Sequence, residues 1–146
     1  MEEILPLPEA LQTRLAALVD SAYADVQANA SAEQKAASER LDKQLGEDKE
    51  QFGLMMMNMN ADFEAADVNQ DGVLDAAESR VFIQKMDERD RAEGRYANAT
   101  DAQMDEIYAI ANAINSDYEG YNFMEDWLIV SGNFVKLWMA KSAASQ

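Results

Sequence analysis

Residues 67–78 hold oxygen-bearing side chains at a regular spacing. The run reads DVNQDGVLDAAE and has an acid or an amide at its first, third, fifth, ninth and twelfth positions, which are Asp67, Asn69, Asp71, Asp75 and Glu78. A segment that wraps around one point turns alternate side chains inward, so this spacing would bring hard oxygen ligands together. Ca²⁺ is bound by about six to eight such oxygens at about 2.3–2.6 Å. The run therefore predicts a site for a hard divalent cation.

Neighbouring positions complete the expected ligand shell. Gly72 is sixth in the run and permits a sharp turn, because glycine adopts a positive φ at little cost. Val73 would offer its backbone carbonyl, and Asp75 would bind directly or through a water molecule. Glu78 falls in the first turn of the next helix, where both of its carboxylate oxygens can close the shell. The alternative is an acidic loop without an ion, in which four crowded carboxylates would repel one another.

At these residues the sequence resembles the EF-hand superfamily of calcium-binding proteins, and the apolar Leu74 at the eighth position matches as well. The resemblance implies a helix, the loop and a second helix, with Asp67, Asn69, Asp71, Val73 (through its carbonyl), Asp75 and Glu78 as calcium ligands. EF-hands form pairs, because one helix–loop–helix unit cannot bury its own apolar face. The resemblance therefore covers roughly residues 55–141.

Residues 115–126 resemble a degenerate second loop when they are aligned on Gly120. The candidate ligands of this weaker site are Asn115, Asp117, Glu119, Tyr121 and Asp126. Asp126 is one methylene shorter than the usual glutamate, which weakens Ca²⁺ binding or favours a smaller ion such as Mg²⁺. Asn122 replaces the apolar residue at the eighth position and would distort the short bridge between the loops. The alternative is a metal-free loop that holds the first loop in place.

Apolar residues elsewhere recur every three or four positions, which predicts helices and an all-α fold. One amphipathic helix is expected over roughly residues 8–28. Ser31 and Gln34 then form a capping-box pattern at the start of the next helix. Residues 32–66 fit either one long helix with a thin waist or two helices that break near Gly46.

The last part of the chain repeats the helix–loop–helix pattern. Thr100 and Gln103 form a second capping-box pattern before a helix that reaches Ile114, and a closing helix follows the second loop. We therefore expect an EF-hand pair with additional N-terminal amphipathic helices. The expected division is an N-terminal helical region at residues 1–54 and a paired EF-hand domain at residues 55–142.

The chain is strongly acidic. It has 28 acidic and 12 basic residues among 146, which gives a formal net charge of −16. A chain with this charge repels nucleic acid and anionic membrane surfaces, so we expect no nucleic-acid partner. Cations and basic or amphipathic protein segments are its natural ligands.

Cysteine and histidine do not occur in the sequence. This excludes disulfides, thiolate zinc sites, cysteine nucleophiles and histidine-based catalysis. Because no acid–base pair stands out beyond the two loops, we do not expect an enzyme. No apolar run approaches the roughly 18–20 residues of a membrane span. The acidic start at residues 1–6 also differs from a secretory signal, so we expect a cytoplasmic protein.

Four of the nine methionines lie within residues 55–59. Adjacent helical residues point about 100° apart, so these side chains cannot all face one core. In calcium sensors of the EF-hand superfamily, ion binding opens a Met-rich groove for an amphipathic helix. The resemblance thus implies a protein target with an amphipathic or basic helix, and a partner surface made of Met55, Met56, Met59, Phe82 and Met86. The alternative is that the N-terminal helices cover these methionines permanently.

Three roles are consistent with these features. The leading hypothesis is an intracellular calcium sensor or adaptor that presents a Met-rich hydrophobic surface to a partner. The second is a structural or assembly subunit in which calcium rigidifies the EF-hand pair. The third is a calcium buffer, which one well-matched loop in 146 residues makes inefficient.

Overall fold

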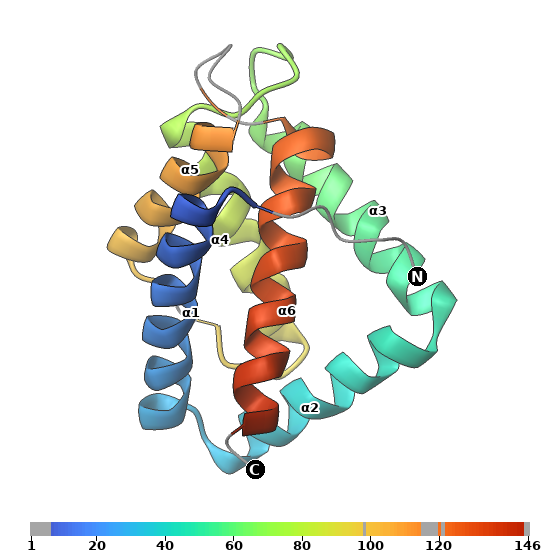
Figure 1. Ribbon diagram of the computed structural model, residues 1–146. Coiled ribbons are helices and arrows are strands. Elements are labelled where there is room, and N and C mark those ends of the chain that lie inside the picture. The colour runs from blue at the N-terminus through green and yellow to red at the C-terminus, as the bar shows by residue number, and fades with distance from the viewer. Residues whose placement is uncertain (1–6, 98, 115–119, 121, 145–146) are drawn as a thin grey trace.

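The structure is a computed structural model, and it describes residues 7–97, 99–114, 120 and 122–144 (Figure 1). Within these residues the chain forms α-helices and one short π-helical turn, η1. Their bounds are α1 Glu9–Asn29, α2 Ala32–Glu47, α3 Lys49–Ala66, α4 Ala76–Ala92, α5 Asp101–Ile114, η1 Phe123–Trp127 and α6 Leu128–Ala144. The described residues contain a single bridge residue, Leu74, and no extended strand. The prediction of an all-α fold is confirmed.

Helix starts follow the capping signals in the sequence. Ser31 and Gln34 form the expected capping box at α2: the Gln34 N–H donates to Ser31 Oγ at 3.1 Å, and the Ser31 N–H donates to Gln34 Oε1 at 2.8 Å. Thr100 and Gln103 form the same reciprocal pair before α5, with both distances at 3.1 Å. Both predicted capping boxes are confirmed.

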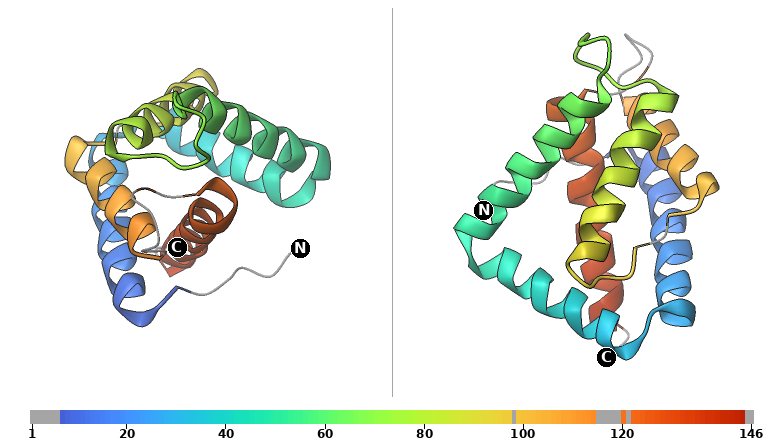
Figure 2. Two further views of the ribbon diagram at one scale, coloured as in Figure 1. Left: turned by 90° about the horizontal axis from the view of Figure 1, so that it is seen from above. Right: turned by 180° about the vertical axis from the view of Figure 1, so that it is seen from behind.

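The stretch 32–66 forms two helices, which settles the alternative that the sequence left open. The break falls at Asp48, two residues after Gly46, where the backbone is extended. Asp48 Oδ1 accepts hydrogen bonds from the N–H groups of Glu50 at 2.9 Å and Gln51 at 3.4 Å, so the side chain caps α3. Asp48 therefore ends α2 and begins α3. The two helices meet at a corner that projects from the molecule (Figure 2).

The helices enclose one apolar core. α3 packs against α4, α4 against α5, and α1 against both α5 and α6. The deepest side chains come from α1, the 67–75 loop, α4, α5 and α6, and they include Leu15, Leu74, Phe82, Ile110 and Val130. Phe82 makes T-shaped contacts with Phe63 and Trp127, with ring centroids 5.9 and 4.9 Å apart. These contacts tie the helices on both sides of the loop into the same core.

The N-terminal helix α1 belongs to this core. Leu11, Leu15 and Leu18 are buried in it, and α3 runs without interruption across residues 54 and 55. The division into regions 1–54 and 55–142 stays a prediction. None of the helices in the described part of the chain has both the length and the apolar character that crossing a bilayer requires.

Candidate metal centre

Two helix ends position the first and last residues of the 67–78 loop. Asp67 ends α3, and its N–H donates to the Phe63 carbonyl at 2.9 Å. Asp75 begins α4 as its N-cap and forms a capping box with Glu78. The Glu78 N–H donates to Asp75 Oδ1 at 2.8 Å, and the Asp75 N–H donates to Glu78 Oε1 at 3.2 Å. The loop therefore begins and ends on fixed backbone.

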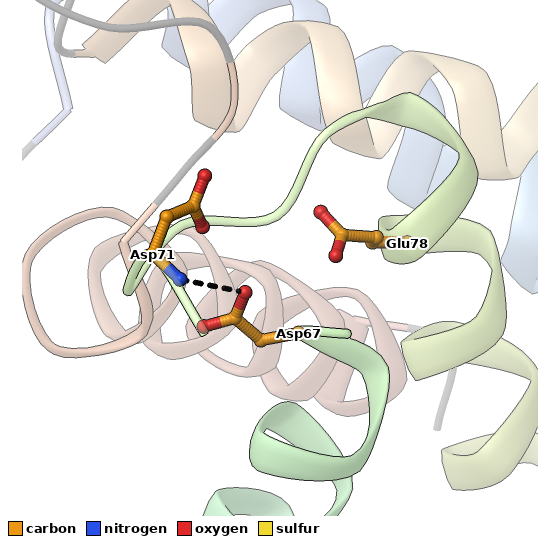
Figure 3. A group of neighbouring side chains, drawn as sticks. All are labelled: Asp67, Asp71 and Glu78. Carbon is orange, nitrogen blue, oxygen red and sulfur yellow. Dashed lines mark hydrogen bonds between the residues drawn. The ribbon is translucent and has the colours of Figure 1, made fainter. Parts of the chain in front are cut away.

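The middle of the loop winds around the Asp67 carboxylate. Its Oδ2 accepts the N–H of Gly72 at 2.9 Å, and its Oδ1 accepts the N–H of Asp71 at 3.3 Å (Figure 3). The tight path needs left-handed backbone at Gly72, with φ of 84°, and at Gln70, with φ of 58°. The conformation of Gly72 agrees with the prediction, whereas Gln70 has no glycine to signal it.

Three carboxylates converge inside this loop. One oxygen each from Asp67, Asp71 and Glu78 lies within 4.8 Å of the others, and the side chains point toward a common space (Figure 3). Oxygens that share one Ca²⁺ at about 2.4 Å lie no more than about 4.8 Å apart. In the described part of the chain no Lys or Arg forms an ion pair with any of the three. The donor set and its spacing fit a divalent cation.

The other three predicted ligands surround this group. Asn69 Oδ1 accepts the N–H of Asp71 at 3.3 Å, and the Val73 N–H donates to Asp71 Oδ1 at 3.1 Å. Asp75 lies outside the converging group because its carboxylate caps α4. Its contribution to an ion, directly or through a water molecule, stays a prediction.

Glu78 connects the two ends of the loop. Besides the bond from Asp75 to Oε1, its Oε2 accepts the N–H of Val68 at 2.9 Å. One side chain on α4 thus holds the backbone just after α3. Any force on this carboxylate acts on both helices.

Most of the candidate second site lies outside the described residues, namely Asn115, Asp117, Glu119 and Tyr121. The remaining candidate, Asp126, is buried, and its Oδ2 accepts the Asn122 N–H at 3.1 Å. The backbone there forms η1, whose first residue follows Asn122 directly. Metal binding by the 115–126 loop stays a prediction.

Gly120 and Asn122, two described residues of the second loop, lie against the first loop. A Cβ atom on Gly120 would overlap the carbonyl oxygen of Leu74, and Gly120 has a φ of 115°. The Asn122 Nδ2 donates to the Gly72 carbonyl at 3.4 Å, so this residue links the loops instead of only interrupting their bridge. In the sequence Gly120 serves to align the second loop with the EF-hand pattern, but no feature of the sequence indicates that Gly120 lies close to the Leu74 carbonyl.

The predicted partner surface lies mostly against the core in this structure. Phe82 is fully buried, and Met56, Met59 and Met86 are partly buried against the core residues. Met55 is half-buried. Their role in partner binding stays a prediction.

One residue near the loop was missed in the sequence. Asp62, on α3, is 5% exposed and accepts two hydrogen bonds from Arg89 of α4, from Nε to Oδ2 and from Nη2 to Oδ1, both 2.8 Å long. The bond to Asp62 is the main cause of a raised pKa for Arg89. The sequence does contain a sign of this pair: Asp62 follows Met59 by three residues and precedes Ala66 by four, so it stands at a helical position where an apolar core residue is expected. Such a buried acid requires a partner.

Comparison of the chain with protein-family models, with curated protein sequences and with solved structures finds no match.

Proposed function

We propose that this chain is a calcium-binding protein of the EF-hand type and that it binds one Ca²⁺ ion in the 67–78 loop. The observation that carries the proposal is the convergence of Asp67, Asp71 and Glu78, at the first, fifth and twelfth positions of the run. These residues come from the end of one helix, the loop and the start of the next helix. Asn69 and the Val73 carbonyl would add further oxygens, with Asp75 acting through water.

The ion would offset the repulsion of three neighbouring carboxylates. Each carboxylate accepts backbone N–H groups, and these hydrogen bonds hold it in one orientation. Ligand groups that are ordered in advance lose little conformational entropy on binding. This supports a site that the folded chain offers ready-made.

Calcium would act on the packing of α3 and α4, because Glu78 bonds to the backbone at both ends of the loop. Ca²⁺ at 100-fold its dissociation constant stabilises the bound state by about 2.7 kcal/mol. A helix rearrangement that costs less than this would follow ion binding. The proposed role is an intracellular sensor or adaptor whose apolar surface is presented to a partner protein in response to calcium.

A second role is favoured by one observation. Of the residues expected to form the responsive surface, Phe82 lies in a core that includes α1, and Met56, Met59 and Met86 pack against it. In a structural subunit calcium would stiffen the loop while this core stays closed. A hydrophobic reporter dye separates the two roles: a sensor gives a calcium-dependent rise in dye fluorescence at micromolar free ion, whereas a structural subunit gives a flat signal.

The ligand assignment is tested by substituting Glu78. Glu78→Gln keeps the size of the side chain but removes the charge, so we expect calcium affinity to fall by at least about 100-fold, as for loss of a charge-assisted contact. Competition with a chromophoric chelator measures the change. Glu88→Gln, which removes the same charge from an exposed position on α4, should bind like the wild type. Equal affinities for the Glu78 and Glu88 variants would refute the assignment.

A further inference from the structure

Helix α3 carries apolar side chains on two opposite faces, and the described part of the chain leaves the outer face uncovered. The face toward the core carries Met59, Phe63 and Ala66, of which Phe63 and Ala66 are buried. On the opposite face Leu54 is 50% exposed and Met57 is 69% exposed. A surface helix of a globular protein normally turns polar side chains to the solvent on the side opposite the core. In Figures 1 and 2 the outer side of α3 forms an edge of the molecule with no helix beyond it.

The exposed face follows a regular pattern. Leu54, Met57 and Ala61 are separated by three and then four residues, so they lie in one row along the helix. From Gln51 to Ala61 no residue carries a charge, although 27% of the chain is charged. An uncharged, exposed row in an acidic protein is a surface suited to another helix.

No contact or backbone conformation in the described part of the chain requires a glycine at position 53. It lies inside α3, and a Cβ atom there would meet nothing within 4 Å. A glycine inside a helix costs roughly 0.5–1 kcal/mol relative to alanine. Gly53 precedes Met57 by one helical turn, so its missing side chain leaves room for close approach beside the apolar row.

An acid stands at each end of the row. Glu50 precedes Leu54 by four residues, Glu64 follows Ala61 by three, and both are exposed. A complementary helix would carry a basic residue near each end. A second copy of this chain would not fit: antiparallel α3 helices would place Glu50 against Glu64, parallel ones would place like residues together, and each chain carries a net charge of −16.

We propose that this outer face of α3, made of Leu54, Met57 and Ala61 between Glu50 and Glu64, docks an amphipathic helix of a partner protein. The partner helix would carry apolar residues at the same spacing and a Lys or Arg near each end. The face points away from the core and from the predicted Met55, Met56 and Met59 surface. It goes beyond the proposed calcium site and does not depend on an ion.

The test uses a fluorescent amphipathic peptide of about 18 residues, long enough to span the face, with Leu on one side and Lys at both ends. Binding to the full chain is measured by fluorescence anisotropy. Met57→Glu is compared with Met139→Glu, which adds the same charge at a methionine on α6 that is 60% exposed. Attraction by net charge alone would be increased equally by both substitutions.

We expect Met57→Glu to weaken binding by at least about tenfold despite the added charge, as at an interface anchor, and Met139→Glu to leave it within about twofold. Neutralising both ends with Glu50→Gln and Glu64→Gln should weaken binding several-fold and reduce its dependence on salt. The wild-type chain should bind the peptide equally well in saturating Ca²⁺ and in excess chelator. A loss of peptide binding in either condition would tie the face to the proposed metal site and contradict its independence of an ion.

Four outcomes overturn the docking proposal. One is that the wild-type chain does not bind the peptide at about 100 µM, well above the range of specific complexes. Another is equal binding by the Met57 and Met139 variants. A third is self-association of the wild type that Met57→Glu abolishes, which would make the occupant a second copy. The last is wild-type binding to phosphatidylcholine vesicles that Met57→Glu abolishes, which would make it a lipid surface.

Discussion

Asp67 contributes at three points to the order of the 67–78 loop. Its backbone N–H continues the hydrogen bonds of α3, and its carboxylate accepts the N–H groups of Asp71 and Gly72. The side chain is buried, yet two backbone donors satisfy it, so the charge is tolerated. A single residue therefore ends a helix, shapes the turn and aims an oxygen at the proposed ion.

Substituting alanine for Gly120 and for Gly53 should change the free energy of unfolding in opposite directions. Gly120→Ala adds a Cβ atom that overlaps the Leu74 carbonyl, at a φ of 115° that L-residues rarely adopt. We expect a loss of about 2–4 kcal/mol of unfolding free energy. Gly53→Ala meets no neighbour inside α3 and should stabilise the chain by about 0.5–1 kcal/mol. Urea unfolding of both variants measures the difference, and equal effects would show that the two loops are not in contact.

The candidate ligands of the first loop stand out in the sequence because metal coordination would require their spacing. The convergence of Asp67, Asp71 and Glu78 agrees with that spacing. The conformation of Gln70 and the approach of Gly120 to Leu74 could not be predicted, since both depend on contacts that close only when the chain folds.

At the scale of the elements, an ion pair between a buried Asp62 and a half-exposed Arg89 joins the two helices that flank the loop. Asp62 on α3 and Arg89 on α4 share two hydrogen bonds in planar, paired geometry. Asp62 lies five residues before Asp67, the first of the candidate metal ligands. The ion pair resists any change in the relative position of the helices that calcium is proposed to move.

Removing this pair should loosen α3 from α4. Asp62→Asn leaves Arg89 without its carboxylate, and we expect a loss of about 1–3 kcal/mol of unfolding free energy, less than for a fully buried pair because Arg89 is half-exposed. Arg80→Gln breaks the exposed bridge to Asp105 and should have no measurable effect. Chemical denaturation compares the two variants. A neutral Asp62→Asn would mean that the pair does not hold the helices.

The residues at which helices begin could be predicted from the sequence better than which helices pack against each other. The two capping boxes and the extent of α1 follow from local hydrogen bonding and apolar spacing. The corner at Asp48 was one of two alternatives, because the polar stretch after Gly46 weakens a helix without fixing its end. Apolar spacing shows that α1 has a buried face, but it does not tell which helices cover it; the structure places α5 and α6 there.

At the scale of the whole molecule, a chain of net charge −16 buries some of its acids at a cost. Asp42 on α2 pairs with Arg95, which follows α4, at 3.1 Å. Asp90 on α4 is nearby, and burial raises its pKa to about 6 although Arg95 acts to lower it. Burial also raises the pKa values of Asp42 and Asp87. These acids make the stability of the fold depend on pH.

The raised pKa of Asp90 determines in which direction the stability of the fold changes with pH. The pKa of Asp90 is higher in the folded chain than its ordinary value of 3.8, so protonation of Asp90 favours folding below about pH 4, and this contribution is lost as the pH rises through about 6. Asp90→Asn should therefore be more stable than the wild type at pH 8, by about 1–2 kcal/mol, and the difference should vanish near pH 4. Thermal unfolding across this pH range checks it. The exposed substitution Glu88→Gln serves as the control and should not show the same pH-dependent gain.

The proposed stoichiometry is one Ca²⁺ ion per chain. The most direct measurement is a calorimetric titration of chelator-stripped protein with Ca²⁺ in millimolar Mg²⁺. We predict saturable binding of about one ion per chain at micromolar or lower free calcium, within the range of EF-hand sites, and loss of that binding in Asp67→Ala. No saturable heat in the wild type, or the same isotherm after Asp67→Ala, would contradict the calcium site.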